Sequence, residues 1–234
     1  MLISKPEGLT LFEFLKRTNA AQTHFIALAG AAVGFFFLFH FAKAPFTWIE
    51  VVGCLLFGLG AMAVFGSSAL YHFLTDGFVV APRLSHWLRN IDHFAIYLFI
   101  AASYTAVLIK VETGPWREIL TIVIWTLAIA GILYTAVKHK LPAWAQHRLV
   151  YTAGFVAMGW TILPRITELF HRLSVTENWF LVGAGASYLI GAVIYASKKP
   201  VLIKDFFGFH ELWHLFVMAG YTFQYLLVFR LYCA

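Results

Sequence analysis

Charged residues are scarce in this chain. Only 12% of its residues are Asp, Glu, Lys or Arg and 61% are hydrophobic, whereas soluble domains contain about 25% charged residues. This composition excludes an ordinary soluble domain and favours a protein that lies in a lipid bilayer. We therefore interpret the formal net charge of +6 as a sign of membrane topology and not of a nucleic-acid partner, because Lys and Arg mark the cytoplasmic loops of membrane proteins.

Cysteine is almost absent. The two cysteines, Cys54 and Cys233, lie far apart in the sequence and show no metal-binding spacing, so a zinc site built from thiolates is excluded. We expect both to be packing residues. A disulfide between them would require that the fold bring them close together.

Seven apolar segments are long enough to cross a bilayer, since a span needs about 20 apolar residues. Short links that contain Pro, Gly or charged residues separate them. The predicted spans cover residues 22–42, 48–73, 90–109, 117–137, 149–170, 178–197 and 209–232. The predicted fold is therefore an all-α, integral membrane bundle of seven transmembrane helices, and Pro164 is expected to kink the fifth.

Residues 1–20 form the only sizeable polar lead, ahead of a transmembrane domain predicted over 21–234. Within this segment, Thr10 and Glu13 have the spacing of a capping box. Leu15, Lys16 and Arg17 then suggest a short amphipathic helix on the cytoplasmic surface. A frayed N-terminal tail is the alternative.

The distribution of Lys and Arg predicts the orientation. Eleven of these residues lie on the side of the N-terminus and five on the other side. The positive-inside rule then places the N-terminus in the cytoplasm and the C-terminus outside. We expect a multi-pass protein of the bacterial inner (plasma) membrane.

Two histidines at the start of the last span stand out. His210 and His214 are four residues apart, so a helix projects them from the same face about one turn apart. Ionisable residues inside a membrane are uncommon and indicate a functional site. Two imidazoles can bind a transition metal, but a stable site needs a third ligand.

The alternation of spans supplies further candidates at the same membrane face. The second span ends there with Ser68 and His72, and the third begins there with Asp92. Ser68 and His72 are also four residues apart and share a helix face. We predict that His72, His210 and His214 bind one metal ion, with Asp92 beside it and Ser68 close behind. Asp92 carries a separate argument, because a carboxylate in a span is costly unless it is paired.

The remaining histidines are weaker candidates. His24 opens the first span at the same face, where we expect a structural or supporting role. His93 points roughly 100° away from Asp92 on a helix and is expected to be a neighbour. The others are predicted at the opposite side or in links: His40, His171, His86, His139 and His147.

Three imidazoles and an open fourth position favour zinc. Two histidines together with Asp92 would instead form a ferrous site with a facial triad. Haem is disfavoured, because histidines one turn apart cannot flank a porphyrin from both faces. Zinc would make a bound water acidic near neutral pH, Asp92 could accept its proton, and Ser68 could donate to a carbonyl oxygen.

The apolar surroundings predict a substrate or ligand that enters from the lipid bilayer, such as a lipid with an amide or ester bond. Two alternatives remain open at this stage. The protein could be a lipid-sensing or regulatory membrane protein whose zinc is structural, or a haemolytic protein that forms a pore. No periodic polar stripe supports a pore, and the sequence does not indicate an oligomeric state.

The motifs Ser68-Ala-Leu-Tyr-His72, Asp92-His-Phe-Ala-Ile-Tyr97 and His210-xxx-His214, in this order, resemble the hemolysin III family. That family is the bacterial arm of the progestin and adipoQ receptors, which are related to adiponectin receptors and alkaline ceramidases. The resemblance implies seven helices with the N-terminus inside, and zinc bound by the three histidines. It also implies that Asp92 contacts the zinc-bound water and that Ser68 lies nearby. A metal-dependent hydrolase of lipid amides with a role in membrane lipid homeostasis would fit this group.

One motif has a competing interpretation. His210-Glu211-xx-His214 also matches the H-E-x-x-H of zinc proteases, in which the Glu is the general base. No third ligand of the protease type follows it in the sequence. We therefore favour Asp92 over Glu211 as the base.

Overall fold

The computed structural model describes residues 2–4, 6, 8–43, 46–204 and 206–233. Within this part of the chain, seven helical segments are long and apolar enough to cross a membrane, as predicted. Six are continuous helices: α2 (Asn19–Phe41), α3 (Trp48–Gly77), α4 (Pro82–Val111), α5 (Pro115–Val137), α9 (Val175–Ser197) and α10 (Phe209–Cys233). The fifth span is built from α7 (Arg148–Gly159) and α8 (Ile166–Arg172).

Short elements lie at the ends of the bundle. Strand β1 (Ile3–Ser4) pairs antiparallel with β2 (Val79–Val80), which joins α3 to α4. Helix α1 (Leu11–Arg17) precedes α2, and helix α6 (Ala143–Gln146) precedes α7. Two 3₁₀ turns complete the described elements, η1 (Lys138–Lys140) and η2 (Leu163–Arg165).

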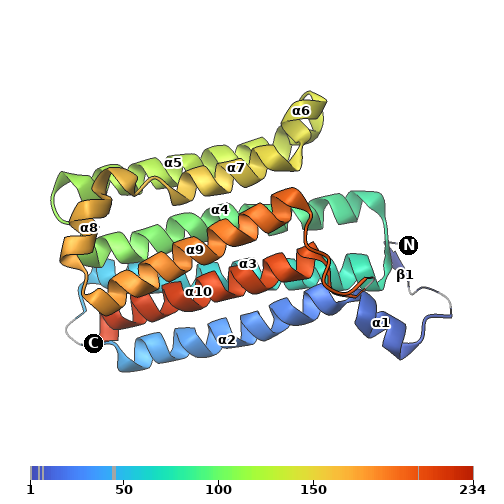
Figure 1. The fold of residues 1–234 in the computed structure, drawn as a ribbon, viewed down its shortest axis with the longest axis horizontal. Coiled ribbons are helices and arrows are strands. Elements are labelled where there is room, and N and C mark those ends of the chain that lie inside the picture. The colour runs from blue at the N-terminus through green and yellow to red at the C-terminus, as the bar shows by residue number, and fades with distance from the viewer. Residues whose placement is uncertain (1, 5, 7, 44–45, 205, 234) are drawn as a thin grey trace.

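The spans form a closed ring in chain order. Each contacts the next one along the chain, and α10 closes the ring against α2 and α9. Figure 1 shows α5 and α7 side by side along one edge of the bundle and α2 along the opposite edge. This order brings the end of α3 and the starts of α4 and α10 to one end of the molecule, which we call the histidine end.

Local sequence signals explain where the helices begin. Capping boxes start three of them, and their side chains are Thr10 with Glu13, Thr47 with Glu50, and Ser174 with Glu177. Hydrogen bonds from the backbone and side chain of Thr10 also lower the pKa of Glu13 below its ordinary value. Prolines occupy the first turn of α4 and α5, where the missing N–H has no intrahelical partner in any case.

Helices α3 and α4 are longer than predicted. The second span was predicted to end at residue 73 and the third to begin at 90, but α3 continues to Gly77 and α4 starts at Pro82. Arg83 and His86 therefore lie on a helix and not in a link. The polar residues in this region were interpreted as a link. That interpretation was wrong, because a helix that extends beyond the apolar layer can contain polar residues without a break.

The fifth span is interrupted where a kink at Pro164 was predicted. Helix α7 ends at Gly159, a turn follows, and η2 contains the proline. Proline removes a backbone donor and clashes with the preceding turn of a helix. The span is therefore two short helices, and α8 leaves the line of α7 (Figure 1).

The main core contains a group of buried aromatic residues, Phe57, Phe65, Phe99 and Tyr221, whose rings contact one another. A second, smaller cluster lies between α4, α5 and α7. There Tyr97 packs against Gly131 so closely that a Cβ atom on this glycine would lie 2.2 Å from Tyr97 Cε1.

Cys54 is buried within the main core, and both cysteines are free thiols. This agrees with the packing role expected for Cys54. Neither cysteine therefore contributes a thiol to the histidine end of the bundle.

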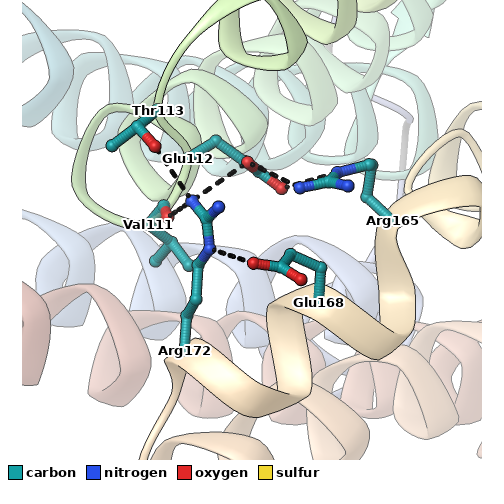
Figure 2. Close-up of polar contacts among 6 residues, drawn as sticks. All are labelled: Val111, Glu112, Thr113, Arg165, Glu168 and Arg172. Carbon is teal, nitrogen blue, oxygen red and sulfur yellow. Dashed lines mark hydrogen bonds and ion pairs between the residues drawn. The ribbon is translucent and has the colours of Figure 1, made fainter.

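An ion-pair network lies at the other end of the bundle, where α4 meets α8 (Figure 2). Glu112, just after α4, is 1% exposed and accepts hydrogen bonds from Arg165 Nε at 3.2 Å and Arg172 Nη1 at 3.2 Å. Arg172 also donates to the Val111 carbonyl at 2.8 Å and to Glu168 at 2.8 Å. Arg165, which lies within the predicted span 149–170, thus has Glu112 as a buried partner. The network holds α8 against α4.

Candidate metal site

Three histidines from two helices meet at the histidine end. His72 lies near the end of α3, and His210 and His214 lie in the first two turns of α10. Each offers one ring nitrogen, and these nitrogens all lie within 4.8 Å of one another. His72 and His214 are buried and His210 is partly buried. The structure therefore brings together the three residues predicted as ligands in an arrangement that could hold a metal ion.

The hydrogen-bond pattern fits a bound cation. Nδ1 of His72 lies 2.9 Å from Oδ2 of Asp76, and a carboxylate only accepts, so Nδ1 carries the hydrogen and Nε2 carries the free lone pair. That Nε2 lies 3.1 Å from Nε2 of His210. His214 is 0% exposed, and within the part of the chain that the structure describes neither of its ring nitrogens has a hydrogen-bond partner. Buried imidazole lone pairs without partners are costly, and a shared cation would satisfy them.

Asp76 was not predicted from the sequence. It lies one helical turn after His72 and fixes the tautomer and ring orientation of that histidine, as carboxylates behind metal-ligating histidines commonly do. The sequence signal was the i, i+4 spacing of His72 and Asp76, but Asp76 was assigned to a link. The extension of α3 to Gly77 places both residues on one helix face.

Ser68 and Asp92 share a cavity with the cluster. Ser68 lies one turn before His72 on α3, and Asp92 lies on α4; the two residues are 4% and 7% exposed. Both line the cavity that is also lined by His72 and His210. Asp92 is not part of the group of mutually close donor atoms, which among the described residues contains only histidines. This arrangement fits three imidazole ligands with a carboxylate nearby better than a two-histidine, one-carboxylate set.

The cavity is large and mostly apolar. Its volume is about 630 Å³, and it extends from the histidines to the turn after α7 and to residues of α8 and α9. Its lining beyond the polar end includes Trp213, Ile162, Leu169, Phe170 and Leu181. A pocket with a few polar groups at one end and apolar walls elsewhere suits an amphipathic ligand.

The weaker histidine candidates lie in different surroundings. His24 is buried against His214, with ring centroids 3.9 Å apart, and no described residue forms a hydrogen bond with either of its ring nitrogens. His93 also lines the cavity, and its Nδ1 lies 2.7 Å from the Arg89 carbonyl.

Glu211 accepts a hydrogen bond from the backbone N–H of Gly208 at 2.8 Å, which places its carboxylate at the start of α10. A carboxylate in this position caps the helix. This contact gives Glu211 a structural role that does not involve the cavity.

Comparison with known proteins agrees with this architecture. A family model described as "Haemolysin-III related" matches residues 12–225. The Hemolysin-3 homolog of Bacillus subtilis (strain 168) is 28% identical over 210 residues, or 90% of this chain and 91% of that protein. Hemolysin-3 of Bacillus cereus is 29% identical over 209 residues, or 89% and 88% of the two chains.

A similar human protein is the Monocyte to macrophage differentiation factor, which is 25% identical over 181 residues, or 77% of this chain and 71% of that protein. The family match covers all seven spans in whole or in large part. The two Bacillus relatives fit the bacterial plasma membrane as the location. This chain is a multi-pass integral membrane protein and belongs to the hemolysin III family.

Proposed function

We propose that the protein is a zinc-dependent hydrolase of amide or ester bonds in membrane lipids, with a role in membrane lipid homeostasis. The observation that carries this proposal is the position of the three-histidine cluster at the polar end of an apolar cavity that also contains Ser68 and Asp92. Three imidazoles form a donor set typical of zinc sites that keep one position open for catalysis. In a tetrahedral zinc site, ligand nitrogens are separated by about 3.3 Å, close to the 3.1 Å between His72 and His210.

Zinc bound here would act as a Lewis acid and make water a better nucleophile at neutral pH. His72, His210 and His214 would hold it. Asp92 would accept a proton from the attacking water and return it to the leaving amine or alcohol. Ser68 would donate a hydrogen bond to the substrate carbonyl oxygen. In the overall reaction, water adds to the acyl carbon, the C–N or C–O bond breaks, and a fatty acid is released.

The apolar walls of the cavity support a lipid as the substrate class. Phe170 and Leu181 are examples of the side chains that would contact an acyl chain. Because lipid tails are as apolar as these walls, an acyl chain can move from the bilayer into the cavity without a large change in free energy. The acyl chain would thereby position the polar linkage at the end of the cavity where Asp92 and the histidines lie.

The test combines metal analysis with turnover on purified wild type, Asp92→Asn and Glu118→Gln. Glu118 is an exposed carboxylate of α5 and serves as the matched control. We expect wild type and Glu118→Gln to contain zinc and to release fatty acid from ceramide-like lipids. We expect Asp92→Asn to retain zinc and to lose turnover by about 100-fold or more, which is the usual contribution of a general base.

Turnover by Asp92→Asn at the wild-type rate would contradict the assigned base. Zinc-loaded wild type that cleaves none of a broad panel of lipid amides and esters would favour a lipid-sensing protein with structural zinc. A wild type that contains no zinc after preparation in its presence would contradict the metal site itself.

A further inference from the structure

A second hollow lies at the histidine end, between the start of α4 and the end of α5, apart from the cavity described above. Its volume is about 460 Å³. The residues that line it are Arg83, His86, Trp87, Asn90, Phe94, Ala136 and His139. Its polar side chains can all donate hydrogen bonds. Two of them, Arg83 and His86, were predicted in a link but lie on α4.

Among the described residues, the lining of this hollow contains a cation, Arg83, and no acidic side chain. The sequence has no Asp or Glu between Asp76 and Asp92, or between Glu118 and Glu168. These two stretches contribute every residue of the lining except Phe94. Arg89, Lys138 and Lys140 lie in the same stretches. The described lining thus carries positive charge, which attracts anions.

A hydrogen-bond chain orients one buried donor. Arg89 Nη2 lies 3.3 Å from His86 Nδ1, and a guanidinium only donates, so Nδ1 accepts and Nε2 of the neutral ring carries the hydrogen. His86 Nε2 lies 3.1 Å from a terminal atom of the Asn90 amide. The structure has Nδ2 of Asn90 at this position, but because His86 Nε2 donates, we reassign the atom as the acceptor oxygen, which moves NH₂ to the position of Oδ1. That position is buried and has no hydrogen-bond partner among the described residues, and Asn90 as a whole is 3% exposed.

The geometry points to a binding site for the phosphate headgroup of an anionic phospholipid. Arg83 and His139 would contact the phosphate oxygens, and the NH₂ group of Asn90 would complete the donor set. Basic pockets between transmembrane helices at the cytoplasmic side are typical sites for such headgroups. This inference is independent of the proposed hydrolase activity, because it involves a different hollow.

The aromatic residues favour a lipid over free phosphate. Trp87 is 54% exposed, and Trp residues of membrane proteins concentrate at the level of the headgroups. Phe94 lies two helical turns further into α4 and would contact the first part of an acyl chain. The lining of the hollow therefore combines polar side chains with aromatic ones, as a phospholipid requires.

The test measures lipid binding by native mass spectrometry of the purified full chain in detergent, titrated with dioleoyl-phosphatidylglycerol or dioleoyl-phosphatidylcholine. We expect wild type to bind the anionic phosphatidylglycerol about tenfold more tightly than the phosphatidylcholine. Each basic residue at a membrane surface contributes about fivefold to such a preference. Arg83→Gln should reduce this preference to about twofold. Lys199→Gln, which removes the same charge from an exposed position at the same end, should leave it unchanged.

Asn90→Leu removes the buried amide without changing the charge, and we expect it to lower the preference severalfold. If this variant does not fold, His139→Gln provides the second measurement. An equal loss in Lys199→Gln, or no preference in wild type, would reduce the effect to diffuse surface charge and overturn the proposal. Displacement of the lipid by an equal concentration of glycerol phosphate would identify a soluble phosphate as the ligand and overturn the lipid assignment.

Discussion

The bundle carries a polar cluster at each end, and the two differ in how their polar atoms are paired. At the end where α4 meets α8, Glu112 is fully buried but receives hydrogen bonds from two arginines, one of which also binds Glu168. At the histidine end, His24 and His214 are buried, and none of their ring nitrogens has a hydrogen-bond partner among the described residues. The charge of Glu112 is compensated by its partners, whereas buried imidazoles without partners call for an explanation such as a bound ion. The comparison distinguishes a cluster whose polar atoms are paired from one that could hold a ligand.

The largest expected effect comes from breaking the paired cluster. Glu112→Ala leaves Arg165 and Arg172 without their carboxylate, and we expect it to lower the free energy of unfolding by about 3–5 kcal/mol, as for other buried pairs that lose one partner. Thermal unfolding in detergent measures this loss. The zinc affinity of the protein that remains folded should equal that of wild type, and a large change in affinity would show that the two ends are coupled.

His210→Ala should have the opposite effects: a large loss of zinc affinity and little loss of folding stability. Structural zinc sites in zinc-finger peptides bind with about 10–16 kcal/mol from four ligands, so the loss of one ligand should weaken zinc binding by roughly 3 kcal/mol, or more than 100-fold. His210 is partly buried. In the absence of zinc, we expect the variant and the wild type to unfold at nearly the same temperature. Metal analysis and thermal unfolding with and without a chelator measure the two quantities. Normal zinc content in this variant would remove the histidine cluster as the metal site.

Asp76→Asn tests the residue behind His72. The amide keeps the shape of the side chain but loses the negative charge that orients the imidazole, so we expect a loss of zinc affinity of about 10–100-fold. Competition with a chelating dye measures this affinity. Asp76→Glu serves as the conservative control and should recover part of it. An unchanged affinity in Asp76→Asn would show that the contact with His72 has no effect on the ligand.

The smallest expected effect is at the ion pair between Lys110 and Glu50, whose nitrogen and oxygen are 2.7 Å apart. Both side chains are partly exposed, so we expect Lys110→Met to lower the free energy of unfolding by about 1 kcal/mol or less. Thermal unfolding at low and high salt measures it. A loss as large as that of Glu112→Ala would contradict the distinction between buried and exposed pairs drawn here.

Periodicity and span alternation predicted the features that depend on one helix at a time. Seven apolar runs gave the seven spans, and the i, i+4 spacing of His210 and His214 placed both imidazoles on one face. Alternation of direction then brought His72, Ser68 and Asp92 to the same end. The metal itself, the role of each residue and the orientation in the membrane remain predictions.

Features that depend on how helices meet were not predictable. The sequence showed Arg165 within a span but gave no partner for it, because its contact with Glu112 depends on the break between α7 and α8. Asp76 was missed because the polar residues after Leu74 suggested a link, whereas α3 continues through them. Close packing of Tyr97 on Gly131 likewise requires knowledge of which face of α5 turns toward α4.

The length of α3 has a consequence for the depth of the histidines. With 30 residues, this helix is about 45 Å long, whereas the hydrocarbon layer is about 30 Å thick. His72 lies five residues before the end of α3, so it sits only about 7.5 Å inward from that tip. If α3 is centred in the hydrocarbon layer, about 7.5 Å of it extends beyond the layer at each end, and His72 would lie at the boundary where acyl chains join their polar heads. A diffusing amphiphile could then reach the pocket sideways, without leaving its own leaflet.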